Sequence, residues 1–221
     1  MRGDKLVIEP WHVKVALEAR ELLLPHIAGN EGRFVITIAG ESGSGKTEIA
    51  AVLSQSLSEL GVGNIILQQD DYFVYPPRTN EQVRRKDITS AGPGEVHLDL
   101  LDQNLADILE GRSQITKPLV VFEEDRITEE TVSLDGVQAV IVEGTYTSAL
   151  KNAHRRLFID RTYVDTRETR RLRARETQDA FLEKVLEIEH GIISSHRSRA
   201  DIIITRDYEV RENGAREGRH A

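Results

Sequence analysis

Residues 40–47 read Gly-Glu-Ser-Gly-Ser-Gly-Lys-Thr and fit the pattern G-x-x-x-x-G-K-[ST] at every fixed position. The apolar stretch RFVITIA at 33–39 predicts a short buried strand before this motif, and residues 48–60 predict a helix after it. A strand, a glycine-rich loop and a helix in this order are the context in which the pattern binds phosphate. The fold is therefore expected to be organised around a phosphate-binding loop.

Each residue type in the motif suits a phosphate site. Glycines let the backbone turn at positive φ and approach a ligand closely, so that N–H groups of the loop and of the helix N-terminus can surround phosphate oxygens. Lys46 can reach the terminal phosphates, and the hydroxyl of Thr47 suits Mg²⁺. A plain structural turn, the alternative, needs no such Lys-Thr pair. The expected nucleotide-binding residues are Gly40, Ser42, Gly43, Ser44, Gly45, Lys46 and Thr47.

The composition is that of a soluble globular protein. The 221 residues are 39% hydrophobic and 30% charged. A net charge of −8 argues against a chain that coats nucleic acid, and the absence of cysteine excludes disulfides and thiolate metal sites. No apolar run has the length of a membrane span, and the N-terminus MRGDKLVIEP lacks the apolar core of a signal peptide. We expect a cytoplasmic protein without nucleic-acid or membrane partners, and a homo-oligomer remains compatible with the composition.

Short apolar stretches alternate with helical stretches along the chain. Further strands are expected at 64–68, 137–142, 157–160 and 202–205. Further helices are expected at 11–28, 96–110, 165–176 and 178–195. Alternation of fully apolar strands with helices is typical of a parallel sheet covered on both faces. The sequence therefore predicts an α/β three-layer sandwich with a mostly parallel central sheet, in one domain over 1–221.

Further segments are expected to surround this sandwich. Residues 119–122 and 131–134 predict a small hairpin on the substrate side. The stretch 72–94 lacks a periodic pattern, and because long irregular segments in compact domains are usually functional, we assign it to the substrate site. The polar residues 211–220 are expected to fray. Residues 1–32 are expected to be a helical extension packed on the sheet, with a regulatory arm as the alternative.

Acidic residues directly follow two of the expected strands. Asp70 and Asp71 follow the second strand, and Glu143 ends another. Ligands of open α/β sheets bind beyond the carboxyl ends of the strands, so these carboxylates are placed for chemistry. Thr47, Glu143 and Asp70 are the candidate Mg²⁺ ligands. Either Asp70 or Asp71 is the candidate catalytic base, because phosphoryl transfer to an alcohol needs a carboxylate within reach of the attacking hydroxyl.

An arginine cluster lies in the expected helix at 165–176. Arginine matches the fork geometry of phosphate oxygens, and we interpret residues 165–198 as a lid that closes over the nucleotide, together with the helix that follows it. Arg167 and Arg171 are then catalytic candidates, and Arg170 contacts the nucleotide. The alternative is a solvent-exposed face paired with neighbouring acids. The cluster comprises Arg167, Arg170, Arg171, Arg173 and Arg175.

Several motifs occur in a fixed order: GESGSGKT at 40–47, QDDYF at 69–73, VIVEG at 140–144, LFID with DTRETRR over 157–171, and ADIIITR at 200–206. Through the order and spacing of these motifs, the chain resembles the uridine kinase and phosphoribulokinase-like family of P-loop small-molecule kinases, over roughly residues 33–206. The first motif is shared with many nucleotide-binding proteins, whereas the ordered set is much more specific. The resemblance implies transfer of the γ-phosphoryl group of ATP, with Mg²⁺, to a hydroxyl of a small metabolite.

The resemblance also implies roles for individual residues. It makes Asp70 the catalytic base and Glu143 the acid of the second nucleotide motif, and it places the lid arginines at Arg167, Arg170 and Arg171. Arg206 falls where the family's adenine-contacting loop begins. The acceptor is expected to meet Asp71, Tyr72, Tyr75, Arg84 and His97.

The segment that would recognise uridine departs from the family pattern. Uridine kinases place a tyrosine and a histidine there, whereas Val120 and Asp125 stand in those positions. The acids Glu123 and Glu124 suit a polar or cationic acceptor, while the basic residues at 84–86 suit a phosphorylated one. Pantothenate, nicotinamide riboside or a sugar therefore stay open as acceptors beside a nucleoside, and so does a non-catalytic nucleotide-binding regulator. A GTPase is disfavoured because the guanine motif N-K-x-D is absent.

Overall fold

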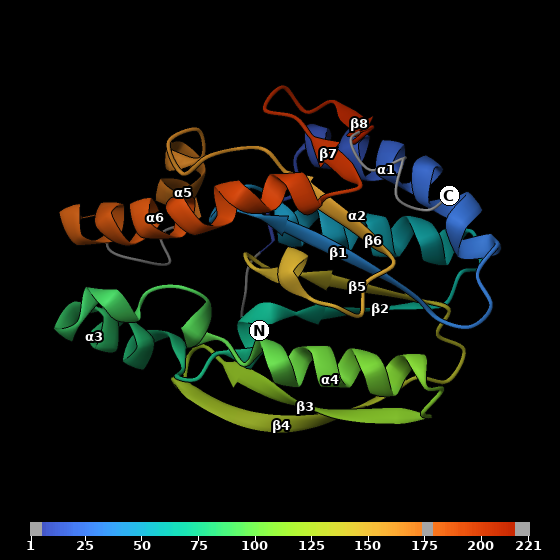
Figure 1. The fold of residues 1–221 in the computed structure, drawn as a ribbon, viewed down its shortest axis with the longest axis horizontal. Coiled ribbons are helices and arrows are strands. Elements are labelled where there is room, and N and C mark those ends of the chain that lie inside the picture. The colour runs from blue at the N-terminus through green and yellow to red at the C-terminus, as the bar shows by residue number, and fades with distance from the viewer. Residues whose placement is uncertain (1–5, 174–178, 215–221) are drawn as a thin grey trace.

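A six-stranded sheet with the order β2-β5-β1-β6-β7-β8 runs through the computed structural model, which describes residues 6–173 and 179–214. Neighbouring strands are parallel except for the antiparallel pair of β7 and β8. Helices lie on both sides of the sheet (Figure 1), which confirms the expected α/β sandwich. The strands are Phe34–Gly40 (β1), Asn64–Gln68 (β2), Ala139–Glu143 (β5), Arg155–Ile159 (β6), Ile202–Ile204 (β7) and Val210–Glu212 (β8).

Strand β1 is buried along its whole length and separates two hydrophobic cores. Successive side chains of a strand point to opposite faces. Accordingly, Phe34, Ile36 and Ile38 join one core, and Val35 and Ala39 join the other. Helices Pro10–Ala28 (α1) and Lys46–Glu59 (α2) cover the first core, and Leu98–Leu109 (α4) and Ala180–Ile193 (α6) contribute to the second. Since both faces are apolar, the polar groups of the site gather at the ends of the strands.

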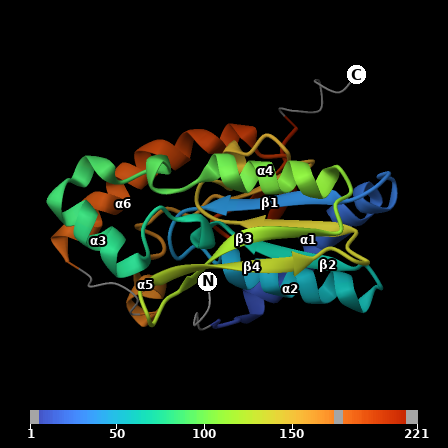
Figure 2. The ribbon, with the colours of Figure 1, turned by 90° about the horizontal axis from the view of Figure 1, so that it is seen from below.

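A two-stranded hairpin lies beside α4, apart from the central sheet (Figure 2). Its strands, Gln114–Val121 (β3) and Arg126–Ser133 (β4), are longer than the sequence predicted. A buried ion pair joins the hairpin to the end of β2, because Lys117 Nζ lies 2.7 Å from Asp71 Oδ2. The backbone N–H of Val120 donates to the other oxygen of Asp71 at 3.1 Å. Asp71 therefore fixes the hairpin next to the loop that carries Asp70.

Helix Pro77–Lys86 (α3) lies within the segment that was expected to be irregular, so that prediction is wrong. Pro77 suits the first turn of a helix because its missing N–H needs no partner there. The carboxylate of Asp125, at the tip of the hairpin, accepts from the N–H groups of Arg78 at 2.7 Å and Thr79 at 3.1 Å. Such a carboxylate satisfies the free N–H groups of the first turn and complements the helix dipole. The cap comes from a distant segment, which explains why the local sequence did not reveal the helix.

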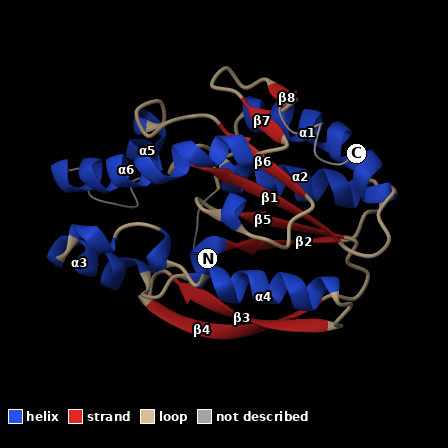
Figure 3. Ribbon diagram, in the orientation of Figure 1, coloured by secondary structure: helices blue, strands red, loops and turns tan. Residues whose placement is uncertain are grey.

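The helix expected at 11–28 is observed as α1, with Pro25 inside it. The C-terminal part of the chain differs from expectation. Residues 210–212 were partly assigned to a frayed tail, yet they form β8 and pair with β7. Helix α5 covers Arg167–Arg173, and the predicted remainder of that helix, with Arg175, falls on 174–178, outside the described residues. Helices α3, α5 and α6 project beyond one end of the sheet (Figure 3). Within the described ranges, no helix is both long and apolar enough to span a bilayer.

The pair of Lys117 and Asp71 is expected to contribute strongly to stability. Both side chains are 4% exposed, so Lys117→Met leaves a buried carboxylate without its main partner. We expect the free energy of unfolding, measured with urea, to fall by roughly 3–5 kcal/mol. Lys151→Met, at an exposed position, is the matched control and should change it by less than about 0.5 kcal/mol. If Lys117→Met lowered the free energy of unfolding no more than Lys151→Met does, the result would contradict the assigned role of the ion pair.

Candidate active site

Strand pairing brings the functional side chains to one row at the end of the sheet. Glu143 pairs with Ile38 of β1 on one side and with Gln68 of β2 on the other. Gly40, which begins the phosphate loop, and Asp70 each lie two residues beyond this row. The register thus places the loop, Glu143 and Asp70 side by side.

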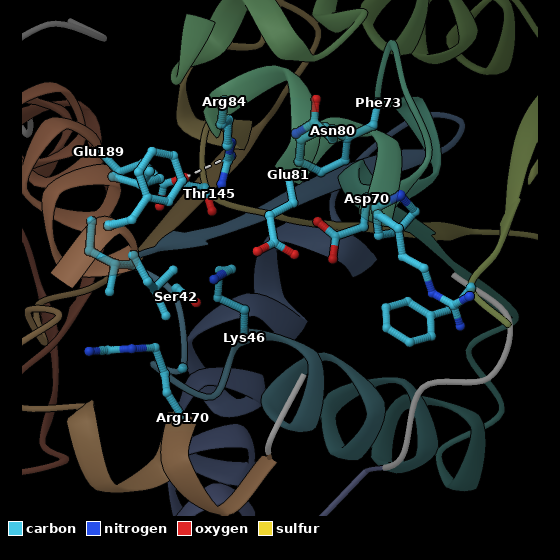
Figure 4. Close-up of a pocket in the computed structure, with 18 of the residues that line it drawn as sticks. Ser42, Lys46, Asp70, Phe73, Asn80, Glu81, Arg84, Thr145, Arg170 and Glu189 are labelled. Carbon is cyan, nitrogen blue, oxygen red and sulfur yellow. Dashed lines mark hydrogen bonds and ion pairs between the residues drawn. The ribbon is translucent and has the colours of Figure 1, made fainter. Parts of the chain in front are cut away.

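Glu143, Asp70 and part of the phosphate loop line a cavity of about 210 Å³ between the sheet end and helices α3 and α6. In Figure 4 the side chains of Lys46, Asp70 and Glu81 point into the same space. The phosphate loop forms one wall, α3 and the hairpin another, and α6 a third. The lining includes Ser42, Gly43, Lys46, Thr47, Asp70, Phe73, Asn80, Glu81, Arg84, Phe122, Glu143, Arg170, Phe181 and Glu189.

The phosphate loop has the conformation that its glycines predict. Gly43 and Gly45 have φ values of 76° and 95°, which residues other than glycine rarely adopt. Lys46 Nζ donates to the carbonyl oxygen of Glu41 at 2.9 Å. The carboxylate of Glu41 lies 2.7 Å from Nδ1 of His190 on α6, so the loop is tied to the helix that faces it.

Four of the seven predicted loop residues line the cavity, namely Ser42, Gly43, Lys46 and Thr47. The other three are not among the lining residues and support the loop. Ser44 is fully buried. A Cβ on Gly40 would lie 2.9 Å from Ser44 Oγ, and one on Gly45 would lie 2.5 Å from Trp11. Close packing against the loop therefore requires glycine at these two positions.

The carboxylate of Glu143 lies where a cation could be shared with phosphates. Thr47 Oγ1 donates to Glu143 Oε1 at 3.1 Å. Burial raises the pKa of Glu143 to about 7, and the nearby charge of Asp70 adds to the rise. Lys46 and the hydrogen bonds from Thr47 and Gln68 act in the opposite direction. Hydroxyl and carboxylate oxygens suit Mg²⁺, which usually combines one or two protein carboxylates with phosphates and water. The donor set therefore fits a magnesium ion held with a nucleotide.

The other half of the cavity combines aromatic and paired charged side chains. Arg84 donates to Glu95 Oε2 at 2.9 Å and to Glu189 Oε1 at 3.1 Å, which links α3 to α6. Arg85 pairs with Asp179 at 2.9 Å. It also pairs with Glu81, and its guanidinium lies 4.6 Å from the ring centroid of Phe181. The charges of Arg84 and Arg85 are thus largely balanced by carboxylates of the protein itself.

Four of the expected acceptor contacts lie outside the cavity lining. Asp71 holds the hairpin, as described above. Tyr72 is fully buried and donates to Asn104 Oδ1 at 2.8 Å, and burial raises the pKa of its phenol. His97 is exposed and directly precedes α4, and its backbone N–H donates to the carbonyl oxygen of Tyr72. Tyr75 is 45% exposed and lies in a separate hollow. Arg84 is the member of this predicted set that lines the cavity.

Of the predicted lid arginines, Arg170 lines the cavity and is 4% exposed. Its guanidinium donates to the carbonyl of Tyr163 and to Thr166, and its Cγ packs against Gly43. Arg167 and Arg171 are exposed and pair with Glu183 and Glu168, as the alternative interpretation of the cluster held. Arg206 is also exposed and pairs with Asp165 at 3.1 Å. Arg167, Arg171 and Arg206 are therefore not among the residues that line the cavity.

The positions that would recognise uridine have structural roles. Val120 is fully buried and donates its N–H to Asp71. Asp125 caps α3. Neither residue lines the cavity.

Several cavity residues were not named individually from the sequence, although the segments that carry them were expected near the site. Glu81 and Glu189 reach the cavity from α3 and α6, and Phe73 and Phe122 add aromatic surface. A signal for α3 was present, because Glu81 and Arg85 are four residues apart and pair along a helix. No local signal marks Phe122, whose place depends on the docking of the hairpin.

Comparison with known proteins places these features in context. The sequence profile of the Phosphoribulokinase / Uridine kinase family matches residues 35–180. A bifunctional alpha-galactosidase/sucrose kinase AgaSK of Mediterraneibacter gnavus is 30% identical over 82% of this chain, which spans only 21% of that protein. A uridine kinase of Macrococcus caseolyticus (strain JCSC5402) is 28% identical over 77% of this chain and 86% of its own. The structure of a possible uridine kinase from Bacillus stearothermophilus superposes with a TM-score of 0.57 at 24% identity, covering 85% of this chain and 98% of that one.

The loop geometry predicts a selective effect of Gly43→Ala. A Cβ at this position would lie 2.8 Å from Arg170 Cγ and would require a strained φ. Because the loop must shift its N–H groups, we expect ATP affinity, measured by calorimetry, to fall at least about tenfold. Gly111→Ala is the matched control, since it has a similar φ of 87° but no atom within 4 Å of the added Cβ. Equal affinities for the two variants would contradict the assigned role of the loop.

Proposed function

The chain belongs to the phosphoribulokinase and uridine kinase family, and on that premise we propose that it is an ATP- and Mg²⁺-dependent kinase that phosphorylates a hydroxyl group of a small metabolite. The observation that carries the proposal is the convergence of Lys46, the pair of Thr47 and Glu143, and Asp70 on one cavity. Lys46, Thr47 and Glu143 suit a bound nucleotide and its cation. Asp70 adds a further carboxylate to the same cavity.

In this mechanism each residue acts through position and charge. The N–H groups of the loop and the ammonium of Lys46 bind and orient the phosphates. Asp70 accepts the proton of the attacking hydroxyl, and the oxygen of that hydroxyl forms the new bond to phosphorus as the bond to ADP breaks. Thr47 and Glu143 would hold Mg²⁺, which when bound neutralises charge on the phosphates. The buried stem of Arg170 keeps the loop in its binding conformation.

We propose further that the acceptor is neutral and carries several hydroxyl groups, as a sugar or a nucleoside does. Free cations would favour a phosphorylated acceptor. Arg84 and Arg85 are paired with protein carboxylates, and the third arginine of α3 in the lining, Arg78, is exposed to solvent. Asp70 and Glu81 offer oxygens that accept hydrogen bonds from hydroxyls, and Phe73 and Phe122 offer apolar surface for a ring. The similarity to a protein that includes a sucrose kinase supports the sugar, and the changed residues at 120 and 125 disfavour uridine itself.

The acceptor class can be tested by the rate of ADP formation with a panel of neutral and phosphorylated compounds. Sugars, nucleosides, pantothenate and nicotinamide riboside should be compared with sugar phosphates at equal concentration and with Mg²⁺ present. We expect a neutral polyol to raise ADP formation well above the rate without acceptor. A response confined to sugar phosphates would contradict the neutral acceptor. If nucleotide binds and no compound raises the rate, a nucleotide-binding regulator becomes the better account.

The role of Asp70 can be tested by Asp70→Asn. Loss of the base should lower kcat roughly 100-fold or more, while calorimetry should still detect ATP binding through the loop. Asp99→Asn, a matched change at an exposed position of α4, should leave kcat within about twofold. An Asp70→Asn enzyme with full activity would refute the assignment of the base.

A further inference from the structure

The order of the strands defines where the rest of a bound nucleotide must lie. Asp70 follows β2 and Glu143 ends β5, and both strands lie on one side of β1. If the reacting phosphate on the loop faces Asp70, the nucleoside part extends in the opposite direction. That direction leads over the ends of β6 and β7, because ligands of such sheets lie beyond the carboxyl ends of the strands.

An aromatic cluster occupies this opposite side. Tyr208 lies in the turn after β7 and stacks on Trp11 of α1, with ring centroids 4.1 Å apart. The guanidinium of Arg161, which follows β6, lies 4.7 Å from the centroid of Tyr208 and 5.7 Å from that of Trp11. Tyr208 has a φ of 61°, an uncommon value for a bulky residue. Such strained residues concentrate at functional sites.

The cluster is in direct contact with the phosphate loop. A Cβ built on Gly45 would lie 2.5 Å from Cη2 of Trp11 and 2.9 Å from Nε2 of His12. Trp11 is held in place by a hydrogen bond of 2.6 Å from its Nε1 to Glu9, and His12 Nδ1 accepts the N–H of Glu9 at 2.9 Å. Trp11 and Tyr208 remain partly exposed. The indole is therefore held at the edge of the loop by Glu9 and by packing against His12 and Tyr208, in a residue that remains partly exposed.

We propose that Trp11 is a positioning residue for the base of the nucleotide, which packs against the wall formed by Trp11, Tyr208 and Arg161. Flat aromatic bases stack on indole, phenol and guanidinium groups, and the wall lies on the side to which the nucleoside extends. The inference rests on the proposed function in one respect, since it takes the donor to be a nucleoside triphosphate bound at the loop. It gives α1, which precedes the residues matched to the family, a role in binding.

Trp11 is the single tryptophan of the chain, so its fluorescence reports on the proposed wall. A non-hydrolysable ATP analogue and inorganic tripolyphosphate, each with Mg²⁺, should be titrated while emission and acrylamide quenching are recorded. Tripolyphosphate can occupy the loop but carries no base. We expect the ATP analogue to change the emission and to reduce quenching, and tripolyphosphate to leave both nearly unchanged.

Two results of this titration would overturn the inference while leaving the kinase proposal standing. One is binding of the ATP analogue, detected by calorimetry, with no change in emission or quenching. The other is an equal optical response to the analogue and to tripolyphosphate. Failure of the analogue to bind at all would overturn the proposed function together with the inference.

Kinetics of Trp11→Ala provide the second test. We expect the KM for ATP to rise roughly tenfold, as for loss of a stacking partner, with kcat within about twofold and tripolyphosphate affinity unchanged. Trp11→Phe should restore most of the ATP affinity. Val13→Ala, at an exposed position of the same helix, controls for a loosened α1. A KM of Trp11→Ala equal to that of Val13→Ala would overturn the inference. A KM of Trp11→Ala below that of the unsubstituted protein would also overturn it, because it would mean that Trp11 blocks the base site. The titration of the native chain remains decisive if Trp11→Ala does not fold.

Discussion

The pairing of β5 with both β1 and β2 is the constraint on which the site depends. It places Glu143 between the strand that leads into the phosphate loop and the strand that leads to Asp70. The hydrogen bond from Thr47 to Glu143 then joins the start of α2 to this row. Because β1 is buried on both faces, a one-residue shift of register would move each of its side chains from one packed core into the other. The packing of the two hydrophobic cores thus fixes the distances among the polar groups at the ends of the strands.

A second level of organisation comes from charged contacts that close the cavity. Arg84 joins α3 to Glu189 of α6, and Glu41 joins the phosphate loop to His190 of the same helix. On the other side, Asp125 ties the hairpin to the start of α3. The acceptor half of the cavity is therefore assembled from segments that contact one another through polar groups. These contacts are directional, so they position the cavity walls as well as holding them together.

The sequence predicted the parts of this molecule whose signal is local. Fully apolar strands, the glycine motif and the acids at the strand ends each carry a pattern within a few residues. Contacts between distant segments could not be inferred in this way. Asp71 looked like its neighbour Asp70, and only the docking of Lys117 separates a structural carboxylate from one that lines the cavity. The cap that Asp125 supplies to α3 is equally invisible from positions 72–94.

The contact between Trp11 and Gly45 illustrates the same limit at the nucleotide site. A helix before the first strand could be predicted from its apolar positions, but not that its first turn packs on the phosphate loop. Similarly, the arginines after Asp165 could be counted, whereas their partners Glu183 and Glu168 had to be seen in the fold. Residues far apart in the sequence thus decide which members of a motif reach the cavity.

The central claim is that this row of groups transfers a phosphoryl group to an acceptor oxygen rather than to water. Phosphorus-31 NMR of the protein with ATP, Mg²⁺ and the best neutral acceptor tests it most directly. The account predicts a growing phosphate monoester signal that matches the loss of the γ-phosphate signal, with little inorganic phosphate. Loss of the γ-phosphate signal into inorganic phosphate alone, with no ester formed, would contradict it.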